Sequence, residues 1–236
     1  MQLTKGISIM DLGLCIESNL ILADIHLGYE ESQNRKGVLI PRVFYKALTE
    51  RLAKSLEGKH FTSIILNGDV KHEFGSIAPS EWRTILSFID FLRRYTDKIV
   101  IIEGNHDPLL KHITAKRNVS LVEHVSLGNT YITHGDVIPK DKEYEAAEII
   151  VIGHDHPAIS LRKMARVETY KCFLKGKWKG KTLIVMPSCN LLTEGSNVLS
   201  RKALSPFLKD REDCELYVVG DNIYRFGKIK DIREKM

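Results

Sequence analysis

Five short apolar runs in this chain each end in a cluster of histidine, aspartate or asparagine residues. The runs are Asn19 to Ala23, Ser63 to Leu66, Lys98 to Ile102, Thr130 to Thr133 and Ile149 to Ile152. Their short length and β-branched composition predict buried strands. The spacing of apolar residues predicts helices over Pro41 to Leu56 and after Pro79. Strands that alternate with helices predict a layered α/β fold, in which ligands gather at the carboxyl ends of the strands.

The clusters carry side chains that bind divalent cations. They are Asp24-Ile25-His26, Gly68-Asp69, Gly104-Asn105-His106-Asp107, His134-Gly135-Asp136 and Gly153-His154-Asp155-His156. Carboxylate, amide and imidazole groups together suit ions such as Mn, Fe or Zn. Residues two apart on an extended strand end share a face, as Asp24 does with His26. The clusters therefore predict a centre for two divalent cations, which points to phosphoester hydrolysis.

Composition limits the alternatives. With 236 residues and 43% hydrophobic content, the chain is expected to form a single domain over residues 1–236. A formal charge of +5 is compatible with an anionic substrate. We expect a soluble, cytoplasmic protein without a membrane segment, because neither a leader peptide nor a long apolar run is evident. The four cysteines lie far apart and are expected to be reduced thiols. His60, His112 and His124 receive no role.

A basic stretch follows the last histidine cluster. Residues 161–181 hold eight lysines and arginines against one acid, Glu168, and three aromatic residues are interleaved. Apolar runs on either side of Gly176 to Gly180 predict a hairpin there, and a second hairpin is predicted around Gly220-Asp221. The basic hairpin could bind DNA or RNA, and four residues are predicted to contact substrate: Lys175, Lys177, Trp178 and Lys179. The alternative is a solvated face whose aromatic residues pack on the core.

The ordered motifs D-x-H, G-D, G-N-H-D, H-G and G-H-x-H resemble those of the calcineurin-like metallophosphoesterase superfamily. This resemblance implies a four-layered α/β/β/α sandwich with two metals at the strand ends. It implies that one metal is held by Asp24, His26, Asp69 and His156. The other would be held by Asp69, Asn105, His134 and His154, so that Asp69 bridges the two.

A narrower similarity covers residues 22–30 and the segment from Arg35 to Pro41, together with Gly-His-Asp-His before Pro157-Ala158. These segments resemble the ICC-like phosphoesterases found near bacterial DNA ligases and in archaea. That branch is similar to double-strand-break-repair nucleases, in which a histidine follows Gly-Asp by three positions. The corresponding residue, His72, is a second candidate for contacting substrate. The alternative is a solvated loop histidine.

The residues suggest a mechanism without a covalent phosphoenzyme. Two cations would clamp the phosphoryl group, and a metal-bound hydroxide would be the nucleophile. His106 is the candidate to protonate the leaving oxygen, and Asp107 is its candidate orienting partner. A structural histidine is the competing interpretation of His106. Asp136 and Asp155 could accept a hydrogen bond from a ligating imidazole, or face solvent.

These features predict a phosphodiesterase or nuclease that acts on a phosphodiester, with DNA or RNA as candidate substrates. A phosphomonoesterase or nucleotide pyrophosphatase would use the same metal centre. A non-catalytic scaffold is a third reading, but it has no need for an intact ligand set. Mn is the expected metal, and Fe, Zn, Ni or Mg would also suit these ligands. The sequence does not encode a recognisable oligomeric state.

Overall fold

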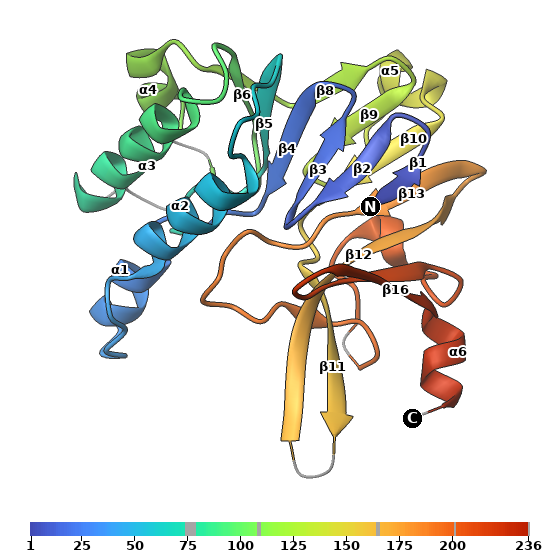
Figure 1. The fold of residues 1–236 in the computed structure, drawn as a ribbon. Coiled ribbons are helices and arrows are strands. Elements are labelled where there is room, and N and C mark those ends of the chain that lie inside the picture. Colours follow the sequence, from blue (N-terminus) through green and yellow to red (C-terminus); the bar gives the residue numbers. More distant parts are fainter. Residues whose placement is uncertain (74–78, 108–109, 164–165, 201, 236) are drawn as a thin grey trace.

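The computed structural model describes residues 1–73, 79–107, 110–163, 166–200 and 202–235, and two β-sheets form its centre (Figure 1). The first sheet follows the order of the chain: β1 (Gln2–Thr4), β2 (Ile7–Met10), β3 (Gly13–Ile16), β4 (Asn19–Ala23), β5 (Ser63–Asn67), β6 (Ile99–Ile102) and β7 (Ser120–Val122). Strands β4 to β7 run parallel to one another, and β1 to β4 pair antiparallel.

The second sheet contains the later strands: β8 (His124–Leu127), β9 (Thr130–Thr133), β10 (Ile149–Ile152), β11 (Pro157–Lys163), β12 (Arg166–Trp178), β13 (Lys181–Val185), β14 (Ser196–Asn197), β15 (Glu215–Val219) and β16 (Ile223–Lys228). At its centre, β10 lies between β9 and β13 and runs parallel to both. The long strand β12 pairs with β11 along its first half and with β13 along its second half. Both sheets are therefore mixed.

Helices cover the outer faces of the sheets (Figure 1). They are α1 (Tyr29–Arg35), α2 (Phe44–Ser55), α3 (Pro79–Leu92), α4 (Lys111–Thr114), α5 (Lys142–Ala146) and α6 (Ile229–Glu234), with short 3-10 turns at Ala115–Arg117 and Pro206–Leu208. The apolar faces of α2 and α3, including Leu48 and Phe88, are buried against the first sheet. Among the described residues, no helix combines the length and the apolar character needed to span a bilayer.

Alternation along the strands divides the interior into two cores. In β10, Val151 belongs to the core between the two sheets, whereas Ile150 and Ile152 belong to the core beneath α5 and α6. This is the expected result of side chains that alternate between the faces of a strand. Helices, sheet, sheet and helices therefore form four layers, which confirms the predicted α/β/β/α fold class.

The predicted elements agree with the observed ones within a few residues at each end. All five predicted strands are present, as β4, β5, β6, β9 and β10, and the two predicted helices are α2 and α3. The two predicted hairpins are β12 with β13 and β15 with β16. The four cysteines are free and buried.

Candidate metal centre

The metal-binding clusters converge because each follows the carboxyl end of a parallel strand. Asp24 and Asp69 follow the neighbouring strands β4 and β5, and Asn105 follows β6. His134 and His154 follow β9 and β10, which are neighbours in the second sheet. The two sheets face each other, so these loops meet at one edge of the sandwich. The expected convergence of the clusters is thus observed.

Four of these side chains form a first group in which one ligand atom from each lies within 4.8 Å of the others: Asp24, His26, Asp69 and His156. The Nε2 atoms of His26 and His156 are 3.3 Å apart. Asp69 Oδ2 lies 3.7 Å from His26 Nε2, and Asp24 Oδ1 lies 3.6 Å from His156 Nε2. This is the set that the family resemblance implies for one cation.

A second group contains Asp69, His134 and His154, again with ligand atoms within 4.8 Å of one another. His134 Nε2 lies 3.0 Å from His154 Nδ1 and 3.6 Å from Asp69 Oδ2. It also lies 2.9 Å from Asn105 Oδ1, which brings the amide oxygen into the same group. Asp69 thus belongs to both groups.

Burial makes this arrangement unfavourable without positive charge. Asp24 Oδ1 is buried, and the structure shows no hydrogen bond to it in the described part of the chain. Burial and the nearby Asp24 charge raise the pKa of Asp69 well above its usual range. Burial lowers the pKa of His26 to about 2, so this ring is neutral and can offer a lone pair at neutral pH. Carboxylates that face neutral imidazoles in a buried site suit divalent cations, because the positive charge favours the ionised carboxylates.

The backbone of the centre is held in an uncommon conformation. Nine non-glycine residues in the described part have a positive φ, and five of them are candidate ligands: Asp24, His26, Asp69, His154 and His156. Such left-handed residues cost energy and persist only when their surroundings fix them. Two bonds from backbone amides do so here: Asp24 Oδ2 accepts from the His154 N–H at 2.9 Å, and Asp69 Oδ1 from the His106 N–H at 2.9 Å.

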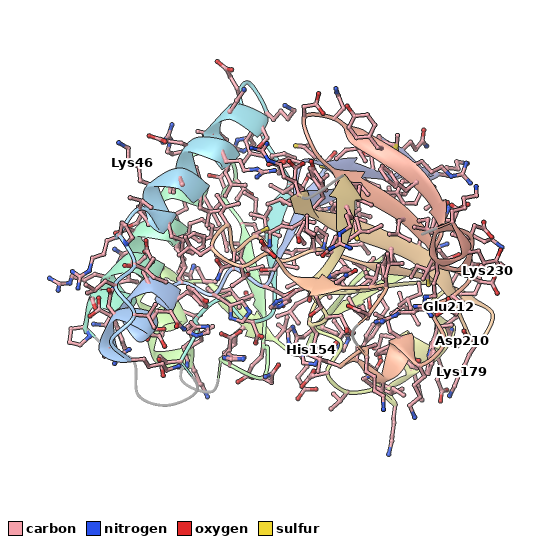
Figure 2. The ribbon with its side chains drawn as sticks, turned by 90° about the horizontal axis from the view of Figure 1, so that it is seen from below. Lys46, His154, Lys179, Asp210, Glu212 and Lys230 are labelled. Carbon is pink, nitrogen blue, oxygen red and sulfur yellow. The ribbon has the colours of Figure 1, made fainter. Side chains whose placement is uncertain are left out.

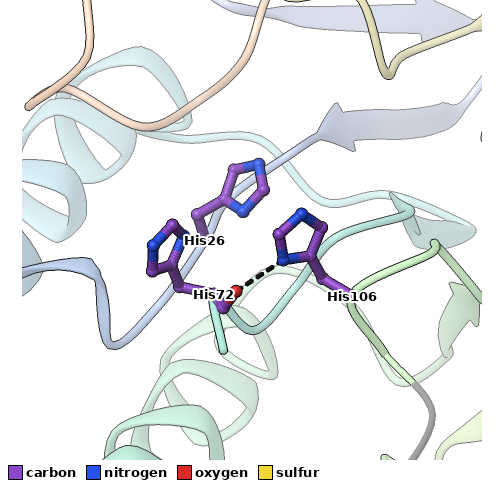
Figure 3. Close-up of side chains that lie close together, drawn as sticks. All are labelled: His26, His72 and His106. Carbon is purple, nitrogen blue, oxygen red and sulfur yellow. Dashed lines mark hydrogen bonds between the residues drawn. The ribbon is translucent and has the colours of Figure 1, made fainter. Parts of the chain in front are cut away.

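Two further histidines lie beside the first group (Figure 3). One nitrogen each of His26, His72 and His106 lies within 4.8 Å of the others. His106 Nδ1 donates to the His72 carbonyl at 2.5 Å, and its Nε2 lies 3.9 Å from Asp69 Oδ2. Since a carbonyl can only accept, this bond fixes the proton on Nδ1 and turns Nε2 toward the centre. Burial lowers the pKa of both His72, to about 4, and His106.

Asp107 is held by backbone groups of two loops. Its fully buried carboxylate accepts hydrogen bonds from the backbone N–H groups of Val70, Lys71 and Gly104, at 3.1 to 3.3 Å. Burial raises its pKa to about 7, although these bonds oppose the shift. Asp107 therefore ties the loop after β5 to the loop after β6.

The two other acids of the clusters are Asp155 and Asp136. Asp155 accepts from the backbone N–H groups of Leu204 and Ser205, both at 2.8 Å, and so anchors a later loop. Asp136 lines a cavity of about 530 Å³ that also reaches Asn105. The two alternatives for Asp155 were a bond from a ligating imidazole and exposure to solvent, and its observed partners are backbone amides.

The basic stretch of residues 161–181 does not lie together at the candidate metal centre, because its carboxyl end is at the far end of the sheet. Trp178 pairs with Lys181 at the start of β13, which is the end of the sheet opposite His154. Figure 2 shows Lys179 apart from His154, toward the side of the molecule that carries Asp210 and Glu212. Residues 164 and 165 and the side chain of Lys163 lie outside the described part of the chain.

The four predicted substrate contacts instead touch other parts of the protein. The Trp178 indole packs on Phe207 and donates to the Tyr144 hydroxyl at 2.8 Å. Lys175 donates to the Leu3 carbonyl, Lys177 to the Thr182 hydroxyl, and the Lys179 ammonium lies over the Trp178 ring. The alternative interpretation, in which the aromatic residues of the hairpin pack on the core, describes Trp178 better. None of the four residues lies beside the candidate metal centre.

The loop after β13 also supports the centre, although the sequence analysis assigned it no role. Residues 187–190 follow β13, just as the other clusters follow their strands. Ser188 Oγ donates to the Asp24 carbonyl at 2.6 Å, and the Cys189 N–H donates to the Ala23 carbonyl at 2.9 Å. Burial raises the pKa of the Cys189 thiol to about 12. The signal was present, because Pro187-Ser188-Cys189-Asn190 also ends an apolar run.

Close backbone contact at Gly104 gives a direct test of the geometry. A Cβ added there would overlap both the amide nitrogen and Oδ1 of Asp69. Gly104→Ala should therefore displace Asp69, lower the free energy of unfolding by about 1–3 kcal/mol and weaken cation binding. Thermal melting and metal titration measure both effects. Gly220→Ala is the matched control, because its nearest contact is 3.5 Å away, and equal behaviour of the two variants would contradict the geometry.

Comparison with known proteins agrees with this arrangement. The family model described as calcineurin-like phosphoesterase matches residues 20–222. The crystal structure of the Pseudomonas putida nuclease MPE has a TM-score of 0.65 and 21% sequence identity, over 92% of this chain and 93% of that chain. A mutant of Entamoeba histolytica Vps29 has a TM-score of 0.38 and 17% identity, over 89% and 98%. Among curated proteins, no sequence matches. The nuclease shares the fold of this chain.

Proposed function

Because this chain belongs to the calcineurin-like phosphoesterase family, we propose that it is a phosphodiesterase that uses two divalent cations, and that its substrates include nucleic acid. The observation that carries the proposal is the position of Asp69 in both ligand groups. A shared carboxylate keeps two cations close enough to act on one phosphoryl group. The narrower resemblance to ICC-like phosphoesterases and repair nucleases supports a diester over a monoester.

The proposed ligand sets follow the two observed groups. Asp24, His26, Asp69 and His156 would hold one cation, and Asp69, Asn105, His134 and His154 the other. Bound cations, with Mn²⁺ as the proposed ion, supply the Lewis-acid charge that offsets negative charge growing on the phosphoryl group. The buried carboxylates orient the ligand loops as well, because Asp24 and Asp69 each accept a backbone N–H from another cluster.

His106 is the proposed proton donor to the leaving oxygen. Its Nδ1–H bond to the His72 carbonyl fixes the ring, so Nε2 faces the centre and can donate a proton only when the ring is in its imidazolium form. Burial lowers the pKa of His106, which makes this imidazolium a stronger acid. His72, half-buried next to His106, is proposed to contact a phosphate oxygen of the substrate.

Metal removal gives the first test of this function. Protein stripped with a chelator should hydrolyse bis-p-nitrophenyl phosphate at the background rate, and added Mn²⁺ should restore turnover. The same Mn²⁺ should raise the melting temperature of the stripped protein, because the cations bind only the folded chain. Faster cleavage of p-nitrophenyl phosphate than of the diester would favour a phosphomonoesterase. A melting shift without hydrolysis of either compound would contradict the proposal and favour a scaffold.

A further inference from the structure

The loop between α1 and α2 exposes apolar side chains that neither core uses. Leu39 is 90% exposed, Val38 51% and Val43 52%. The loop overlaps the segment from Arg35 to Pro41, which carries part of the resemblance to ICC-like phosphoesterases. It supplies no ligand to the candidate metal centre. Single exposed apolar residues are common, but neighbouring ones on one loop mark an interaction site.

The loop is held in place by defined hydrogen bonds. The Asn34 side chain bonds both backbone groups of Ile40, accepting from its N–H at 3.0 Å and donating to its carbonyl at 2.9 Å. The Val38 N–H donates to the Gln33 carbonyl at 3.0 Å. At the far end, the N–H of Phe44 donates to Glu30 Oε1 at 2.6 Å. These bonds fix the base of the loop and leave the side chains at its tip uncovered.

Helix α1 lies in the chain between His26 of the candidate metal centre and this loop. The helix begins three residues after His26, and the Tyr29 ring packs edge-on against His72 at 4.9 Å. At its other end, Arg35 lies 3.8 Å from Glu73, which follows His72 in the chain. Lys36 follows Arg35 directly, and its side chain is exposed. The side of the centre that carries His72 therefore faces basic residues at the base of the loop.

The opposite side of the centre carries negative charge. The cavity of about 530 Å³ beside Asn105 is lined by four acids, Glu103, Glu123, Asp136 and Asp141, and one base, Lys140. A polyanion would be repelled there. A chain of phosphates bound at the centre would therefore extend past His72 toward α1 and its loop.

We propose that residues 35–43 form a nucleic-acid contact beside the centre, in which Lys36 meets a backbone phosphate and Leu39 packs against a terminal or opened base pair. Apolar side chains that accompany cationic ones are used in this way to enter between bases. This inference rests on the proposed function, since it names the partner of the same site. A lipid surface offers a similar combination of anion and apolar contact, and the experiment separates the two.

The test compares Leu39→Ser with Leu204→Ser, whose leucine is 69% exposed elsewhere on the surface. Binding of a fluorescent blunt DNA duplex to chelator-treated protein is followed by anisotropy, and turnover of the duplex and of bis-p-nitrophenyl phosphate is measured with Mn²⁺. Leu39→Ser should lower duplex affinity and duplex kcat/KM about tenfold, whereas Leu204→Ser should not. Hydrolysis of bis-p-nitrophenyl phosphate should be unchanged in both variants, because this small diester does not reach the loop.

Lys36→Gln supplies the electrostatic arm of the test. It should reduce the slope of log affinity against log salt by about 1. Equal duplex binding by wild type and Leu39→Ser, or an absence of duplex binding by wild type, would overturn the inference. Binding to anionic phosphatidylserine vesicles that is lost in Leu39→Ser, without duplex binding, would replace it with a membrane contact. If wild type does not hydrolyse bis-p-nitrophenyl phosphate with Mn²⁺, the proposed phosphodiesterase activity itself fails, whereas the outcomes above concern the loop.

Discussion

Asp69→Asn should lower the turnover of bis-p-nitrophenyl phosphate by about 10³–10⁴-fold. A bound cation contributes several kcal/mol of transition-state stabilisation, and about 1.4 kcal/mol corresponds to a factor of ten. Asp69 is common to both ligand groups, so the loss of its charge affects both cations. Metal analysis of the dialysed variant should find fewer bound ions than in wild type. Asp136→Asn, which alters an acid outside both groups, is the matched control.

The same substitution should have the opposite effect on the stability of the metal-free protein. Without a cation, burial and Asp24 raise the pKa of Asp69. Below about pH 4, the pKa of the carboxyl group in the unfolded chain, Asp69 is protonated in both the folded and the unfolded state. As the pH rises from there toward the raised pKa of the folded state, the folded state loses stability relative to the unfolded state. Asparagine does not ionise and escapes this loss. Urea unfolding in chelator should therefore find Asp69→Asn more stable than wild type at neutral pH, and a less stable variant would contradict the assigned environment of Asp69.

His106→Ala should lower turnover by about 10²–10⁴-fold while the bound metal content stays that of wild type. The reason is that His106 belongs to neither ligand group, although its Nε2 points toward Asp69. A proton donor matters most when the leaving group is a poor one. The loss should therefore be larger for a phenyl ester than for the corresponding p-nitrophenyl ester.

This dependence on the leaving group distinguishes proton donation from a structural role. A histidine that only supports the loop would give the same loss for both esters, and that outcome would remove His106 from the mechanism. His60→Ala is the control, because His60 is exposed and was assigned no role. Metal analysis of both variants shows whether the centre is still loaded.

The strands that carry the centre could be predicted because each is a short apolar run followed by a cluster of histidine, aspartate or asparagine residues. The segments that were missed lack one of these signals. Strands β2 and β3 are as long as β6, but neither ends in a cluster of histidine, aspartate or asparagine residues. Helix α1 has the sequence YEESQNR and buries only Ser32, so no apolar stripe marks it. These segments are defined by their neighbours in the fold rather than by their own pattern.

The site was predictable as a set of residues but not as a set of contacts. The order of the motifs indicates which residues gather, whereas the direction of each side chain depends on the backbone around it. Asp107 and Asp155 both bind backbone amides of other loops, which adjacency to a histidine could not indicate. The basic stretch was misplaced for a related reason, because local charge does not reveal that β12 pairs with β11 first and with β13 afterwards.

The order of the strands in the second sheet bears on how the protein is made. Strand β13 lies next to β10, although β11 and β12 come between them in the chain. Ser188 and Cys189, which secure the loop of Asp24, follow β13. A nascent chain that has emerged only as far as His156 holds every proposed ligand, yet lacks the strand and the loop that fix them. The proposed ligands can therefore take up their final arrangement only after β13 has paired with β10 and the loop that follows β13 has formed.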